Sequence, residues 1–111
     1  MESNPVVKPE KWTIGHYFYY SDKKIGNGSF GNVFLGKNSK NNNDVAIKQE
    51  KEGLKHSQLQ HETIILRELQ GITGIPKIYY YQQEQGIRYL VMELLGKSLE
   101  YLIKLSGLIS L

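Results

Sequence analysis

Three glycines, at positions 26, 28 and 31, are the first residues of this sequence whose spacing suggests chemistry. They lie in the run Gly26-Asn27-Gly28-Ser29-Phe30-Gly31, which continues to Val33 in the pattern G-x-G-x-x-G-x-V. Because glycine has no Cβ, such a loop lets the backbone approach phosphate oxygens closely. A dinucleotide-binding turn has the same glycine spacing, and Asn27-Gly28 alone is enough for a plain hairpin turn. The glycines therefore indicate a phosphate-binding loop but leave its type open.

A lysine ends the apolar run Val45-Ala46-Ile47-Lys48, seventeen residues after Gly31. Strand alternation places Ala46 and Lys48 on one face, where the small alanine leaves room for a flat base and the ammonium can reach phosphates. The alternative is a lysine exposed at the end of a strand. A dinucleotide turn needs a helix that opens at the glycines, whereas Asn32-Val33-Phe34-Leu35 has strand composition. The pattern therefore favours two strands and a loop folded over a triphosphate.

Glu62 is the predicted counter-ion of Lys48. In a helix over residues 58–70, at about 100° per residue, Glu62 falls within an apolar arc formed by Leu59, Ile65, Leu66 and Leu69. An unpaired carboxylate facing the core would be costly, and a buried ammonium also needs a partner. We therefore predict an ion pair between Lys48 and Glu62, and we expect Glu50, Glu52 and Glu68 to lie in solvent.

The elements that position these residues can be read from apolar periodicity and turn signals. The sequence predicts strands over residues 17–25, 33–35, 45–48, 78–82 and 87–92, and a helix over 58–70 that Ser57 caps and Gly71 ends. Ser98 could cap a short final helix that begins at Leu99. Short connections favour an α+β fold, a five-stranded antiparallel sheet with one main helix and a short C-terminal helix. Residues 1–15, which contain Pro5 and Pro9, are expected to form an arm.

Composition excludes several classes of protein. The chain has 111 residues, enough for one domain, and its lack of cysteine excludes disulfides and thiolate metal sites. The three histidines show no metal-ligand spacing, so no metal ligands are expected. The net charge of +3 comes from lysines spread along the chain, so no nucleic-acid partner is expected. No apolar run is long enough for a membrane span and no signal-peptide pattern is present, which predicts a cytosolic or nuclear protein without membrane association.

Together these residues resemble the amino-terminal lobe of a protein kinase, and more closely that of the casein kinase I family of Ser/Thr kinases. Beyond the glycine loop, the resemblance rests on the turn Gly74-Ile75-Pro76, which follows Leu69-Gln70-Gly71, and on the run from Val91 to Glu100. It covers about Tyr20 to Leu102. It implies a kinase lobe with its hinge over residues 16–96 and the start of the second-lobe helix over 97–111.

The resemblance implies a role for each matching residue. Ile25 and Val33 cover the adenine of ATP, Ala46 lines its other edge and Met92 is the gatekeeper. The backbone of Gly26–Gly31 covers the phosphates, Lys48 contacts the α- and β-phosphates, and Glu62 holds Lys48. The hinge residues follow: the Glu93 carbonyl and the Leu95 amide bond the adenine edge, and Ser98 lies near the ribose. Tyr101 departs from the family, which usually has Asp there.

Phosphoryl transfer by this family also needs an H-R-D-type catalytic loop and a D-F-G aspartate that holds Mg²⁺, and neither occurs in the 111 residues. We therefore expect the chain alone to be inactive, and a protein substrate to bind only where a second lobe is present. The alternative function is a non-catalytic module that binds nucleotide weakly or docks on another protein. The apolar tail 99–111 is expected to fold back, self-associate or bind a partner.

Overall fold

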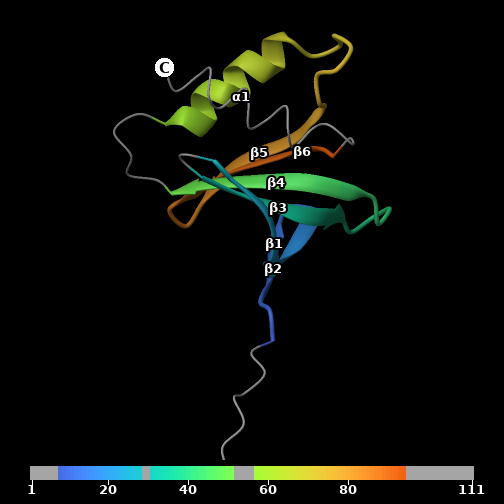
Figure 1. Ribbon diagram of the computed structural model, residues 1–111, viewed down its shortest axis with the longest axis vertical. Helices are drawn as coiled ribbons and strands as arrows, with labels where there is room; N and C mark the ends of the chain where they lie inside the picture. The colour runs from blue at the N-terminus through green and yellow to red at the C-terminus, as the bar shows by residue number, and fades with distance from the viewer. Residues whose placement is uncertain (1–7, 29–30, 52–56, 95–111) are drawn as a thin grey trace, which may run out of the picture.

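The computed structural model describes residues 8–28, 31–51 and 57–94 and shows a curled sheet with one helix on it (Figure 1). The elements in chain order are β1 (Lys11–Ile14), β2 (Tyr17–Gly28), β3 (Gly31–Asn38), β4 (Asp44–Lys51), α1 (Gln58–Glu68), β5 (Ile78–Glu84) and β6 (Ile87–Glu93). Every strand pair is antiparallel, in the order β1-β2-β3-β4-β6-β5. Helix α1 packs on β6 and β5. The α+β class is thus confirmed.

The prediction of five strands was wrong by one, because β1 lies inside the segment 1–15 that was expected to be an arm. Gly15 has a φ of 59° and, with His16, forms the tight turn between Ile14 and Tyr17, which face each other in register. Trp12 packs edge-on against Tyr19, with ring centroids 5.2 Å apart. Polar and apolar side chains alternate within Lys11–Ile14, and their burial alternates in the same way. This alternation is a strand signal, but a segment of four residues beside two prolines is too short for it to stand out. The final helix predicted from Leu99 lies outside the described residues.

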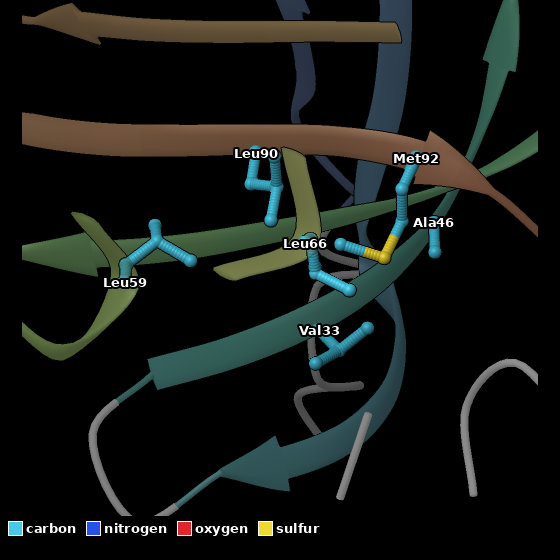
Figure 2. Packing of buried hydrophobic residues seen from close by; sticks show 6 residues of the cluster. All are labelled: Val33, Ala46, Leu59, Leu66, Leu90 and Met92. Carbon is cyan, nitrogen blue, oxygen red and sulfur yellow. The ribbon is translucent and has the colours of Figure 1, made fainter. Parts of the chain in front are cut away.

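The sheet has a separate apolar core on each face. On the face that α1 covers, Figure 2 shows the buried cluster of Val33, Ala46, Leu59, Leu66, Leu90 and Met92. On the opposite face the buried cluster consists of Ile14, Tyr19, Phe34, Val45, Ile47 and Val91. Strands β3, β4 and β6 contribute to both clusters because alternate side chains point to opposite faces. Burial on both faces explains why Val45-Ala46-Ile47 is apolar without a break.

A bulge in β2 sets the direction of Ile25. Lys24 faces Phe34 and Gly26 faces Val33, so two residues of β2 advance while β3 advances by one. The extra residue is Ile25, and its half-buried side chain packs on the same cluster as Val33. A bulge re-aims a side chain in this way and increases the local twist.

Helix α1 begins and ends through side-chain hydrogen bonds. Ser57 is the N-cap, as predicted, and its Oγ accepts a hydrogen bond from the Gln60 amide at 3.0 Å. The helix ends at Glu68, two residues before the predicted end. Beyond it Gln70 turns back, donating to the carbonyls of Leu66 and Pro76 and accepting from the Ile78 amide. Gln70 therefore ties the end of α1 to the start of β5.

We predict that Gly36→Ala destabilises the sheet. A Cβ at this position would lie 2.5 Å from Ile47 Cδ1 and 2.8 Å from the Phe18 carbonyl oxygen, and the backbone oxygen cannot simply rotate away. Overpacking of this kind costs about 1–3 kcal/mol of the free energy of unfolding. Urea denaturation measures it, with Lys24→Ala on the exposed side of β2 as the control. Equal unfolding midpoints for both variants would contradict the packing argument.

Candidate functional site

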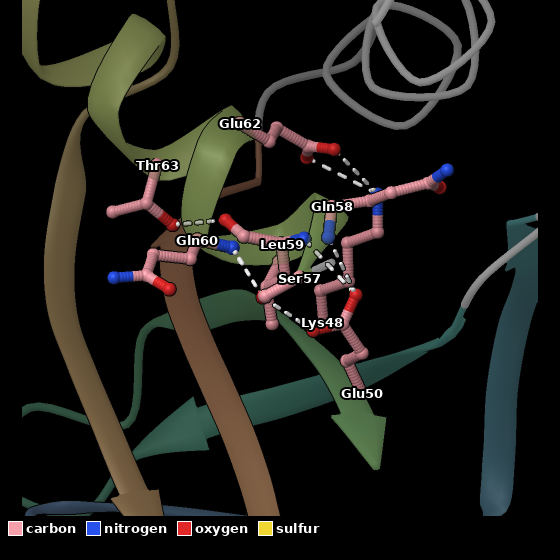
Figure 3. Close-up of polar contacts among 8 residues, drawn as sticks. All are labelled: Lys48, Glu50, Ser57, Gln58, Leu59, Gln60, Glu62 and Thr63. Carbon is pink, nitrogen blue, oxygen red and sulfur yellow. Dashed lines mark hydrogen bonds and ion pairs between the residues drawn. The ribbon is translucent and has the colours of Figure 1, made fainter. Parts of the chain in front are cut away.

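Lys48 and Glu62 form a buried ion pair between β4 and α1. The Lys48 Nζ donates to Glu62 Oε1 at 3.1 Å and to Oε2 at 2.9 Å, and both side chains are at most 2% exposed (Figure 3). The predicted contact is thus confirmed. Two donated bonds to one carboxylate give the geometry that a pair needs when water is excluded.

Strand and helix periodicity explain why the two charges meet. Lys48 shares a face of β4 with Ala46, and in register it lies between Val33 on β3 and Leu90 on β6. Glu62 lies on the buried side of α1, where Leu59 and Leu66 are fully buried. The apolar side chains that bury α1 therefore also press its one core-facing carboxylate against the lysine.

The electrostatics of Lys48 are a balance of opposing effects. Desolvation by burial lowers the pKa of Lys48 below its usual value of 10.5, while the charge and hydrogen bonds of Glu62, and then the charge of Glu50, raise it. Burial has the larger effect. The ammonium therefore depends on its two acidic neighbours for the stability of its charged form.

The residues predicted to surround a base lie together on the α1 face. Val33, Ala46 and Met92 belong to the buried cluster of Figure 2, and Ile25 packs against it. Ala46 and Met92 are direct neighbours across β4 and β6. These four side chains form an apolar platform beside the Lys48 ammonium. An apolar surface next to a cation matches the chemistry of a nucleotide, which has a flat base and charged phosphates. Leu94 also packs on this platform, so a base would have to displace part of the present packing.

The glycine loop continues the hairpin of β2 and β3. Asn27 faces Asn32 and Gly28 faces Gly31 in register, so the strands stay paired up to these two glycines. Asn27-Gly28 is therefore part of a strand and not the turn of a plain hairpin, and a strand, not a helix, follows Gly31. The second finding excludes the dinucleotide-binding turn. Ser29 and Phe30 lie outside the described residues, as do Leu95 and Ser98 of the predicted hinge.

Glu93 ends β6 at the predicted hinge. Its amide donates to the Lys77 carbonyl at 2.8 Å, and its carboxylate accepts from the Lys77 amide at 3.1 Å. These bonds hold the last residue of β6 against the residue before β5.

Glu50 was wrongly expected to lie in solvent. It is only 2% exposed, and its carboxylate accepts hydrogen bonds from the Ser57 hydroxyl and from the amides of Gln58 and Leu59 (Figure 3). The sequence holds only part of the signal, because Glu50 follows Lys48 by two residues but the extent of the strand is not evident from it. Once β4 is known to extend to Lys51, alternation places Glu50 on the same face.

Two negative findings apply to residues 8–28, 31–51 and 57–94. They contain no group of three or more His, Asp or Glu side chains placed to hold a metal ion. Their helix is neither long nor apolar enough to cross a membrane. An apolar pocket lies between β2 and β3. None of its lining residues is a predicted nucleotide-site residue: Phe18, Tyr19, Tyr20, Lys23, Leu35, Gly36 and Lys37.

A curled antiparallel sheet in which a strand lysine is paired with a helix glutamate is the arrangement that the resemblance to a kinase amino-terminal lobe predicts. The sequence pattern of the protein kinase domain matches residues 19–110, and the chain belongs to the protein kinase family. The chain is 46% identical, over 89 residues, to casein kinase I homolog 3 of Schizosaccharomyces pombe. That alignment includes 80% of this chain but 20% of the relative, so the chain spans about a fifth of the relative's length. The chain is therefore a kinase amino-terminal lobe of casein kinase I type.

We predict that the two charges are strongly coupled in stability. Glu62→Leu leaves a buried ammonium without its counter-ion and should cost about 3–5 kcal/mol of the free energy of unfolding. Adding Lys48→Met should restore most of that loss, because two apolar side chains of similar volume can replace a buried pair. Urea denaturation of the wild type, both single variants and the double variant measures the coupling.

The control for this cycle is the exposed pair of Lys37 and Asp44, whose side chains are 41% and 53% exposed. Asp44→Ala should change the free energy of unfolding by no more than about 1 kcal/mol. Additive effects of the Lys48 and Glu62 substitutions would refute the coupling.

A second prediction concerns pH. Glu62→Gln keeps the shape of the side chain but removes the charge that raises the pKa of Lys48, so Lys48 should lose its proton at a lower pH than in the wild type. Between the lowered pKa of Lys48 in the folded chain and its usual value of 10.5 in the unfolded chain, Lys48 is deprotonated when folded and protonated when unfolded. The free energy of unfolding therefore rises with pH across this range, and the range begins at a lower pH in the variant. The ¹³Cε chemical shift of Lys48 reports the titration, with Lys37 as an internal control. A Lys48 titration at unchanged or higher pH would be inconsistent with the assigned cause.

Proposed function

We propose that this chain is the ATP-binding lobe of a Ser/Thr protein kinase, which in a complete kinase transfers the γ-phosphate of ATP to protein Ser or Thr. The observation that carries the proposal is the buried contact between Lys48 and Glu62 beside an apolar platform. Burying a charged pair costs desolvation free energy, which good geometry within the pair or a ligand bound to the ammonium can offset. The family membership supports the same proposal.

Each group has a distinct task in this proposal. The platform of Ile25, Val33, Ala46 and Met92 takes the adenine ring, and the backbone at the end of β6, beyond Glu93, provides the polar edge that orients it. Lys48 neutralises charge on the α- and β-phosphates, and Glu62 keeps the ammonium aimed. The paired strands that lead to Gly28 and Gly31 bring backbone amides over the phosphates.

The proposal assigns Mg²⁺ and the general base to a second lobe. The H-R-D-type loop that carries the base and the D-F-G aspartate that holds Mg²⁺ in this family do not occur in the 111 residues. When bound, Mg²⁺ supplies charge neutralisation on the β- and γ-phosphates. The residues of this chain contribute base binding, phosphate charge compensation and positioning.

The test is nucleotide binding to the purified 111-residue chain, measured by the fluorescence of an N-methylanthraniloyl ATP. The apolar double variant Lys48→Met/Glu62→Leu, which should stay folded, should bind about ten- to a hundredfold more weakly, the loss expected for a bond to a charged donor. Lys37→Met removes an exposed cation from β3 instead and should change the affinity less than about twofold.

Wild-type chain that binds no nucleotide, or a double variant that binds as well as the wild type, would overturn the proposal. The first result would favour the alternative of a nucleotide-free interaction module.

A further inference from the structure

Glu50 is a buried acid whose contacts no step of phosphoryl transfer requires. Its two carboxylate oxygens receive four donors. Oε1 accepts from the Ser57 hydroxyl at 2.6 Å and lies 3.4 Å from an Arg88 guanidinium nitrogen, while Oε2 accepts from the Gln58 amide at 3.1 Å and the Leu59 amide at 3.0 Å. Three of these donors belong to the cap and the first turn of α1, as Figure 3 shows.

This arrangement provides what the first turn of α1 lacks. A helix exposes unsatisfied amides and a partial positive charge at its N-terminus, which an acid in the first turn usually offsets. Helix α1 has no acidic residue in its first turn. The Ser57 hydroxyl accepts from the Gln60 amide and the Ser57 carbonyl from the His61 amide, so the amides of the first two helical residues depend on Glu50 of β4.

The same strand therefore holds the helix at two points. Lys48 and Glu50 are alternate residues of β4, about 6.7 Å apart along the strand. Their contacts on α1, Glu62 and the Leu59 amide, are three residues apart, about 4.5 Å along the helix axis. Beyond the apolar packing of Leu59 and Leu66, one polar contact restrains α1 at a single point. Two contacts on one strand set both the position of α1 and its rotation about its own axis.

We propose that Glu50 is a positioning residue, which anchors the first turn of α1 on β4 so that Glu62 faces Lys48. Arg88, opposite Glu50 on β6, neutralises part of the buried charge. Burial raises the pKa of Tyr81 on β5, while the charges of Arg88 and Arg67 lower it and the charge of Glu50 raises it. The anchoring of α1 does not depend on the proposed function. Only its consequence rests on that function, namely that the Lys48 ammonium is held where a phosphate would bind.

The primary test is Glu50→Gln in the whole 111-residue chain without nucleotide, followed by two exchange rates in NMR. An amide side chain keeps the volume but has no charge and only one acceptor oxygen, so the bonds that the Gln58 and Leu59 amides donate to residue 50 are weakened or lost. The Leu59 amide should lose about ten- to a hundredfold of its protection against hydrogen exchange. The protons of the Lys48 ammonium, which donates to Glu62, should also exchange with water about tenfold faster or more.

A charge-neutral variant separates position from electrostatics. Gln58→Pro removes one amide that Glu50 binds, and proline is compatible with the first position of a helix. The preceding Ser57 is extended, with φ −80° and ψ 112°, as a residue before proline must be. This variant should also speed exchange of the Lys48 ammonium although it changes no charge, and it carries the test if Glu50→Gln does not fold.

Two controls make the inference falsifiable. Glu68→Gln is the same substitution at the exposed last residue of α1 and should leave both rates within about twofold. Arg88→Met should leave the Leu59 amide protected, because the three α1 donors to Glu50 remain. If Glu50→Gln exposes the Leu59 amide but not the Lys48 ammonium, Glu50 is a helix cap only. If Arg88→Met reproduces both losses, the ion pair between strands, and not the anchoring of α1, is what matters. Either result overturns the proposal, and neither bears on nucleotide binding.

Discussion

The buried contact between the Lys48 ammonium and the Glu62 carboxylate is the constraint on which the rest of this lobe depends. Each ion loses its hydration, and the contact between them at 2.9 Å offsets part of that loss. The pair therefore tolerates little displacement of α1 relative to β4. A helix packed by apolar contacts alone could slide by a fraction of a turn at small cost, but this helix cannot do so without separating two charges in a region of low dielectric constant.

A constraint of this kind needs a stiff sheet beneath it. The face of the sheet away from α1 is filled by large side chains, among them Tyr19 and Phe34, whose ring centroids are 4.9 Å apart. Strand β1 adds Ile14 and Trp12 to that core. The face with the aromatic core thus holds the strands in register, which frees the face under α1 to carry three charged groups among its apolar residues. Lys48 and Glu50 lie on β4 and Glu62 on α1, and all three are nearly inaccessible to water.

The polar groups under α1 differ in what they demand of the fold. Lys48 and Glu62 are a mutual pair of opposite charge, so either one alone is a liability. Glu50 instead meets neutral backbone amides and a hydroxyl, with Arg88 at the longer distance of 3.4 Å. Its negative charge also favours the charged form of Lys48. Glu62 therefore acts on Lys48 by direct contact, whereas Glu50 acts through the position of α1 and through its electrostatic field.

The sequence by itself determined the class of fold, the pairing of Lys48 with Glu62 and the cap at Ser57, because each depends on local periodicity, residue type or the length of a connection. Alternation in a strand and the 3.6-residue turn of a helix assign faces without knowledge of the rest of the chain. Ile25 required the structure, since its direction results from a bulge between β2 and β3, and a bulge depends on the register of two strands. Strand β1 required it as well, because four residues with weak alternation are stabilised by the aromatic core they join rather than by their own propensity. Glu50 is the clearest case: an acid near a strand end is ordinarily solvated, and only the arrival of the unsatisfied amides of α1 above it makes burial favourable.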